Sequence, residues 1–121
     1  MNTLEIGKAL GTLLHDIDLH PFRAPEGTPY PFAAYALSGI AVATSKDRYN
    51  YREIATVDIT TAADNYEDAV DLTQRIRAVL EPFEGDCQGI EIGGVRLAAC
   101  RAASPSPGVY LHQLTYQIVI L

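Results

Sequence analysis

The sequence has little positive charge. Nine lysine and arginine residues stand against fifteen aspartate and glutamate residues, which gives a formal net charge of −6. Affinity for nucleic acid comes mainly from neutralising phosphates, and anionic membrane surfaces attract cationic segments in the same way. We therefore expect no specific nucleic-acid binding and no membrane partner.

Cysteine is also scarce. The two cysteines, Cys87 and Cys100, do not form a C-x-x-C pair. A disulfide between them is one alternative, but we favour a reduced pair of thiols, as is usual in a cytoplasm.

The chain lacks the segments that direct a protein to a membrane or across it. Its opening residues, 1–16, have no basic start followed by an apolar run, because Glu5 and Lys8 interrupt the pattern. No stretch of the sequence is apolar over the length that spans a bilayer. The expectation is a protein that is made in a cytoplasm.

Motifs of catalysis and metal binding are missing as well. The histidines fall in neither an HxH nor an HExxH pattern; they are His15, His20 and His112. Gly93-Gly94 is not followed by the Lys-Ser or Lys-Thr of a phosphate loop, and Ser104 and Ser106 lack a nucleophile-elbow pattern. We predict no enzymatic activity, no cofactor and no metal. The remaining enzymatic alternative pairs His112 with the thiol of Cys87 or Cys100.

What the sequence does contain is a strand, a turn and a helix between Tyr51 and Glu81. Alternating apolar residues, Ala55, Val57 and Ile59, predict a strand with one buried face. The period then changes to three and four residues, which predicts a helix with one apolar stripe. That stripe comprises Tyr66, Ala69, Val70, Thr73, Ile76, Val79, Leu80 and Phe83.

The ends of this helix carry their own signals. Asp64 stands where an N-cap belongs, and Glu67 follows three residues later, as in a capping box. Pro82 cannot continue the helix and ends it. Packing the stripe against the apolar face of the strand gives a fold, and this unit contains no chemistry of its own.

The rest of the chain adds one helix and several strands. A helix capped by Thr3 is expected over residues 3–17, followed by an extended proline-rich loop over residues 20–31. Strands are expected over the ranges 32–44, with a bulge at Ser38-Gly39, 90–92, 95–103 and 111–121, with turns at 84–89, 93–94 and 104–108. In the last strand Leu114, Tyr116, Ile118 and Ile120 share one face.

This order of elements predicts the fold class. At 121 residues the chain forms one domain, residues 1–121, around a single core. Grouped strands interrupted by two helices are typical of an α+β fold. We predict a mostly antiparallel sheet of four to five strands with both helices packed on one face.

Tyrosine and arginine residues gather in two segments outside the predicted core. Both residue types are enriched at protein-interface hot spots, so these segments predict a protein interface. The candidate interface residues are Arg23, Tyr30, Arg48, Tyr49, Tyr51 and Arg52. The alternative is that the tyrosines only pack within the strands and the hairpin.

Taken together, the segments match a known arrangement. After the opening helix, Pro29 to Phe32 leads into a strand, and a charged loop precedes the strand Ile54 to Thr60. The helix Asn65 to Leu80 follows, and the chain closes on the strand His112 to Ile118. This arrangement resembles the tail-completion, tail-terminator-like proteins of tailed phages and prophages, and the resemblance covers most of the chain.

The resemblance implies a structural role. Members of this family are α+β subunits that close into a ring, often a hexamer, at the head-proximal end of the tail tube. They stop tube growth and join the tube to the head connector, and no catalytic residues are carried over. The implied partners are further copies of the chain, the tail tube and the connector. The implied location is the virion tail, after assembly in the cytoplasm of a bacterial host.

The physical properties of the chain agree with this role. An acidic ring lumen repels phosphate, so DNA would pass through it without being held. A head-to-tail ring needs two different patches on each subunit, which the proline-rich loop and the tyrosine-containing hairpin could supply. The alternative function is a small non-enzymatic binding or regulatory module that forms a homodimer through an exposed sheet edge.

Overall fold

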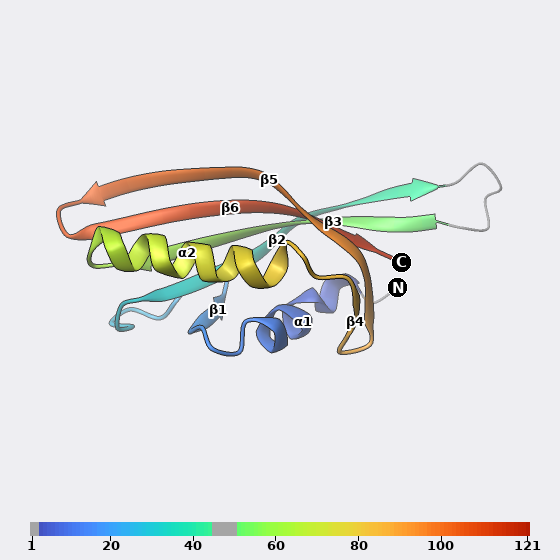
Figure 1. Ribbon diagram of the computed structural model, residues 1–121, viewed down its shortest axis with the longest axis horizontal. Helices are drawn as coiled ribbons and strands as arrows, with labels where there is room; N and C mark the ends of the chain where they lie inside the picture. Colours follow the sequence, from blue (N-terminus) through green and yellow to red (C-terminus); the bar gives the residue numbers. More distant parts are fainter. Residues whose placement is uncertain (1–2, 45–50) are drawn as a thin grey trace.

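A computed structural model describes residues 3–44 and 51–121, which form one curled sheet with two helices (Figure 1). The strands lie side by side in the order β1-β2-β3-β6-β5-β4. The elements are η1 (Thr3–Glu5), α1 (Ile6–Leu13), β1 (Leu19–Pro21), β2 (Phe32–Thr44), β3 (Tyr51–Ala63), α2 (Tyr66–Leu80), β4 (Gly85–Cys87), β5 (Ile90–Ser106) and β6 (Val109–Ile120).

The α+β class is confirmed, but the predicted number of strands is wrong. The sheet has six strands, because β1 and β4 add one short strand at each edge. β1 runs parallel to β2, and every other pair is antiparallel. Each short strand has three residues, which is too few to show a period of two in the sequence.

Four long strands form the body of the sheet, and bulges let them bend. β2 pairs antiparallel with β3, and the register shifts between Leu37 and Gly39, where the bulge was expected. The turn predicted at Gly93-Gly94 is wrong. β5 continues through both glycines with a register shift, so one strand replaces the two that the sequence predicts.

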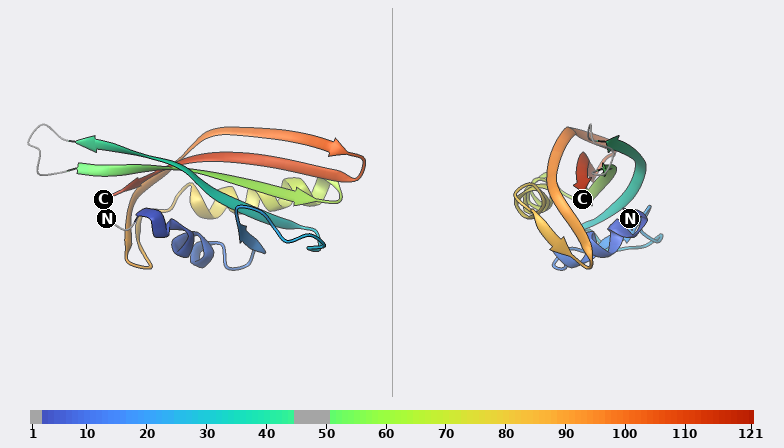
Figure 2. Two further views of the ribbon diagram at one scale, coloured as in Figure 1. Left: turned by 180° about the vertical axis from the view of Figure 1, so that it is seen from behind. Right: turned by 90° about the vertical axis from the view of Figure 1, so that its right-hand side faces the viewer.

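Both helices pack on the same face of the sheet, as predicted (Figures 1 and 2). The predicted core faces of β3 and β6 are confirmed, because their alternating apolar side chains are buried. One continuous core joins these strands to Ile6, Ala9 and Leu10 of α1 and to Leu72, Ile76 and Leu80 of α2.

The first helix is shorter than the sequence predicts. α1 ends at Leu13, and the predicted cap at Thr3 is wrong, because η1 precedes the helix and Glu5 occupies the N-cap without a side-chain bond. The buried Thr3 hydroxyl instead donates a hydrogen bond to the carboxylate of Glu53 on β3. Thr3 therefore joins the start of the chain to the sheet.

The second helix has a different cap and a different stripe from those predicted. Asn65, and not Asp64, is the N-cap, and its side-chain oxygen accepts a hydrogen bond from the Asp68 amide at 2.8 Å. Tyr66 and Val79 of the predicted stripe are exposed, whereas Leu72, which the stripe omits, is buried. Thr73 is buried, and its hydroxyl lies 3.0 Å from the hydroxyl of Thr61 on β3.

Candidate functional site

The predicted interface residues lie at two separate ends of the molecule. Arg23 and Tyr30 belong to the loop between β1 and β2, and Arg52 lies on β3 opposite Ala43, near the end of the β2–β3 hairpin. Tyr51 is the first residue of β3, and Arg48 and Tyr49 lie outside the described residues. Figure 1 shows the β1–β2 loop and the β2–β3 hairpin at opposite ends of the sheet, so these residues do not form one patch.

The β1–β2 loop exposes aromatic side chains. Tyr30 is 42% exposed and stacks on Phe32, with their ring centroids 5.3 Å apart. Phe22 is 77% exposed and does not anchor the loop, although its aromatic character suggests such a role. Its backbone adopts a φ of 63°, a conformation that is uncommon outside glycine, while its amide donates to the Tyr35 carbonyl at 2.7 Å. The loop thus holds an aromatic ring out toward solvent.

An apolar groove lies between this aromatic ring and the start of α1. It has a volume of about 480 Å³ and is lined mainly by Leu4, Ile6, Gly7, Phe22, Tyr35 and Leu37. Leu4 is 80% exposed at its rim. Sequence reasoning missed this groove because its walls come from η1, α1, β1 and β2, and only the fold brings them together.

The groove borders a free strand edge. β1 pairs with β2 only over Ala33 to Tyr35, so the described part of the sheet leaves the outer edge of β2 unpaired from Ala36 to Thr44. Ile40 and Val42 on this stretch are also exposed. Free backbone groups beside exposed apolar side chains make this edge able to accept another strand.

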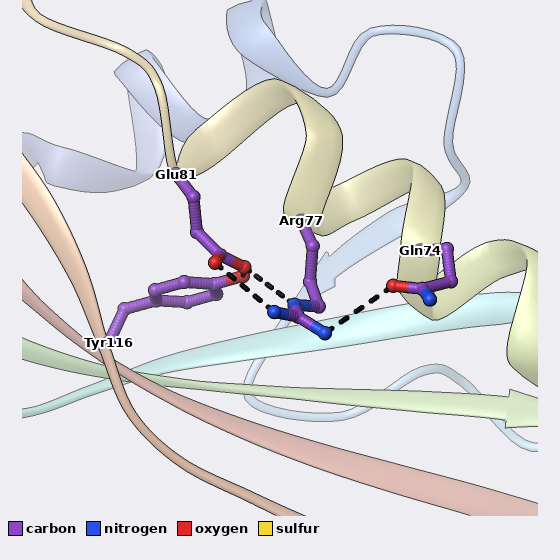
Figure 3. A network of polar contacts seen from close by, with 4 residues as sticks. All are labelled: Gln74, Arg77, Glu81 and Tyr116. Atoms are coloured by element: carbon purple, nitrogen blue, oxygen red, sulfur yellow. Dashed lines mark hydrogen bonds and ion pairs between the residues drawn. The ribbon is translucent and has the colours of Figure 1, made fainter.

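A polar cluster joins the end of α2 to the core. Nε of Arg77 donates to Glu81 at 2.7 Å, and the buried Tyr116 hydroxyl donates to the same carboxylate at 3.0 Å (Figure 3). The hydrogen bond from Arg77 lowers the pKa of Glu81, and burial together with the bond to Glu81 raises the pKa of Tyr116. Each polar group in the cluster forms a hydrogen bond with another member, so the cluster stabilises the end of α2.

The histidine and the cysteines of the enzymatic alternative are only partly brought together. His112 and Cys100 line one shallow hollow beside Arg77, but no hydrogen bond between them occurs among the described residues. Cys87 lies elsewhere in the core, where its thiol contacts the Ala9 carbonyl and burial raises its pKa. The cysteines are not bonded to each other, and Cys100 is exposed.

The described residues form neither a metal-binding cluster nor a membrane-spanning helix. Over residues 3–44 and 51–121, no three histidine, cysteine or acidic side chains gather closely enough to hold a metal ion. Within the same ranges, no helix has the length and apolar character that crossing a bilayer requires.

The fold resembles a chain of a solved virion. No protein-family model matches the sequence, and no curated protein matches it. A chain from the structure described as "Virion of native gene transfer agent (GTA) particle" superposes with a TM-score of 0.63 at 13% sequence identity. The match covers 98% of this chain and 89% of that chain. The two chains therefore share a fold over nearly their whole lengths.

Proposed function

We propose that this chain is a structural protein of a phage or prophage tail. In this role it forms a ring at the head-proximal end of the tail tube, stops tube growth and joins the tube to the head connector. The observation that carries the proposal is the shared fold with a chain of a gene transfer agent virion, which extends over 98% of the sequence. The arrangement of helices and strands along the sequence, which resembles tail-completion proteins, supports the same role.

The described surfaces suit a protein that works through contacts with other proteins. The aromatic β1–β2 loop and the paired ends of β2 and β3, at Thr44 and Tyr51, lie at opposite ends of the sheet. A ring subunit between a tube and a connector needs two such separated surfaces, in addition to those that meet its neighbours in the ring. The proposal assigns no catalytic residue, cofactor or metal.

The distribution of charge bears on the proposed lumen. On the sheet face opposite the helices, the strand register places three cationic residues, Arg52, Arg96 and Arg101, and three acidic residues, Asp58, Asp86 and Glu91. These charges balance, so the acidic excess of the chain lies mainly on the helices and loops. An acidic lumen therefore requires that the helix side of the subunit borders the channel.

Deletion of the gene in a host that produces the particles tests the role. We expect tubes of uncontrolled length that are not attached to heads, and restoration of normal particles when the intact gene is supplied. Electron microscopy of negatively stained lysates measures both tube length and attachment. Normal particles in the deletion strain would rule out the proposed role.

A second candidate function is a small binding module that forms a homodimer. The free outer edge of β2, from Ala36 to Thr44, favours it, because two such edges can pair about a two-fold axis. Native mass spectrometry of the purified chain separates the two functions, because the module gives dimers and the tail protein gives rings.

A further inference from the structure

The sheet has two free edges, and they lie on its opposite sides. On one side β2 is unpaired from Ala36 to Thr44. On the other side β4 pairs with β5 only over Ile90 to Ile92, so the described strands leave the outer edge of β5 unpaired from Gly93 to Ser106. Both short edge strands thus cover only part of the longer strand beside them.

The edge of β2 lacks the features that usually prevent strand pairing. Natural sheets protect exposed edges with charged residues or proline, and β2 contains neither between Ala36 and Thr44. Exposed apolar side chains lie beside it instead, and these are Leu4, Phe22, Ile40 and Val42. Such a surface is typical of a contact with another protein.

The directions of the strands indicate which strand of a neighbouring subunit can pair with the edge of β2. β2, β3, β6 and β5 pair antiparallel in sequence across the sheet, so β2 and β5 run in opposite directions. In a cyclic ring every subunit keeps the same orientation relative to the ring axis. β5 of one subunit would therefore meet β2 of the next in an antiparallel arrangement, the arrangement of the other long strand pairs in this sheet.

The composition of β5 suits this contact. Its free stretch is rich in alanine, including Ala98, Ala99, Ala102 and Ala103, and has no acidic residue. Its two arginines, Arg96 and Arg101, lie on the sheet face opposite the helices, and Pro105 limits the pairing to the part of the strand before it. Small side chains let a second strand approach while leaving room for the larger apolar groups beside β2. The free stretch of β2 lies toward the β2–β3 hairpin, and the free stretch of β5 lies toward the β5–β6 turn. Pairing these two stretches would shift neighbouring sheets along the strand direction, as the strands of closed barrels are staggered.

We propose that the outer edge of β2 binds the outer edge of β5 of a second copy of this chain, so that one sheet continues from subunit to subunit. This inference rests on the proposed ring. It deepens the proposed function by naming the two surfaces that join neighbouring subunits.

The native Cys100 provides a direct test. Cys100 pairs with the buried Leu114 in the ladder, so it lies on the helix side of β5. Ile40 and Val42 lie on the helix side of β2, because Ile40 pairs with the buried Ala55. Ile40→Cys and Val42→Cys should therefore form an intermolecular disulfide with Cys100 of a neighbour under mild oxidation, whereas Ala41→Cys, on the other face, should not.

Non-reducing gels of the purified full-length variants measure the products. We expect cross-linked dimers and longer chains for at least one helix-side variant, several-fold more than for Ala41→Cys, and loss of these products when Cys100→Ser is added. Products that persist with Cys100→Ser indicate pairing of β2 with itself and overturn the proposal. Equal products from all three variants, or none from any, overturn it too.

The cross-linking experiment tests the strand pairing separately from the proposed tail function. Absence of the cross-link together with overlong tubes in the deletion strain would reject the strand pairing and leave the tail role in place. A specific cross-link together with normal particles in the deletion strain would reject the tail role and leave the pairing in place. Each variant is tested for folding by circular dichroism, and the three side chains replaced by cysteine are all exposed in the wild-type chain.

Discussion

At the scale of single residues, the start of α2 has two adjacent candidates for the N-cap. Asp64 and Asn65 are adjacent, and both residue types are good N-caps. The structure uses Asn65, whose backbone is extended and whose side chain reaches the Asp68 amide. The sequence predicts an N-cap at this point. Which of the two adjacent residues acts as the N-cap depends on where β3 ends.

The cap can be tested by a pair of substitutions. Asn65→Ala should lower the free energy of unfolding by about 1 kcal/mol, because it removes the acceptor for a free helix amide. Asp64→Ala is the matched control and should have a smaller effect, since among the described residues Asp64 accepts a bond from the Asn65 side chain alone. Urea denaturation measures both. A larger loss for Asp64→Ala would contradict the assignment of the cap.

Tyr116 predicts a specific dependence of stability on pH. Because its folded pKa is raised above the ordinary value of 10.0, the folded state keeps the phenol protonated where the unfolded chain loses the proton. This contribution to stability is complete below pH 10.0 and is lost as the pH rises toward the folded pKa.

Substitution by phenylalanine isolates this contribution. Tyr116→Phe should cost about 1 kcal/mol at neutral pH, because it removes the hydrogen bond to Glu81, and should flatten the loss of stability in alkali. Tyr66→Phe is the control, since Tyr66 is 62% exposed and should leave the alkaline slope unchanged. Denaturation at a series of pH values gives both slopes, and equal slopes for wild type and Tyr116→Phe would refute the prediction.

At the scale of elements, the sequence predicts long periodic segments well and short or interrupted ones poorly. The alternating faces of β3 and β6 could be predicted because their apolar residues repeat every second position. β1 and β4 could not, because pairing with a neighbour and not local pattern makes them strands. Gly93 and Gly94 inside β5 are typical of a turn in sequence. β5 nevertheless continues through them, because it pairs with β6 both before and after these glycines.

Helix α1 offers a test of how closely it packs on β2. A methyl group at Gly7 would overlap the Tyr35 hydroxyl and lie 2.8 Å from its ring carbon Cζ, whereas a methyl group at Gly11 meets nothing within 4 Å. Gly11→Ala should therefore stabilise the protein by about 0.5–1 kcal/mol through helix propensity. Gly7→Ala should destabilise it by about 1–3 kcal/mol through overpacking. Thermal denaturation compares the two, and equal stabilisation would show that Tyr35 moves aside freely.

At the scale of the whole molecule, the candidate site depends on contacts that no local pattern contains. Arg52 and the proline-rich loop can be picked out from composition, but their separation to opposite ends follows from sheet order. The free edge of β2 and the groove beside it arise because β1 stops at Pro21. Assembly surfaces of this kind are properties of the folded chain and of its neighbours.

The β2–β3 hairpin gives a prediction for assembly. Arg52→Glu should weaken ring or tail assembly without changing the stability of the monomer, because the side chain is exposed near the end of a projecting hairpin. Arg75→Glu makes the same charge change on the exposed side of α2 and should assemble normally. Complementation of the deletion strain, scored by infectious or transducing particles, measures the effect. Full activity of Arg52→Glu would exclude this residue from the interface.

The location of the chain in purified particles tests its proposed role most directly. Particles carrying an epitope tag at the C-terminus of the chain can be labelled with gold-conjugated antibody and imaged by negative stain. We predict gold at the junction between head and tail in tagged particles and none in untagged ones. Label confined to the capsid or the tail tip, or particles that lack the chain altogether, would contradict a ring that closes the tail tube.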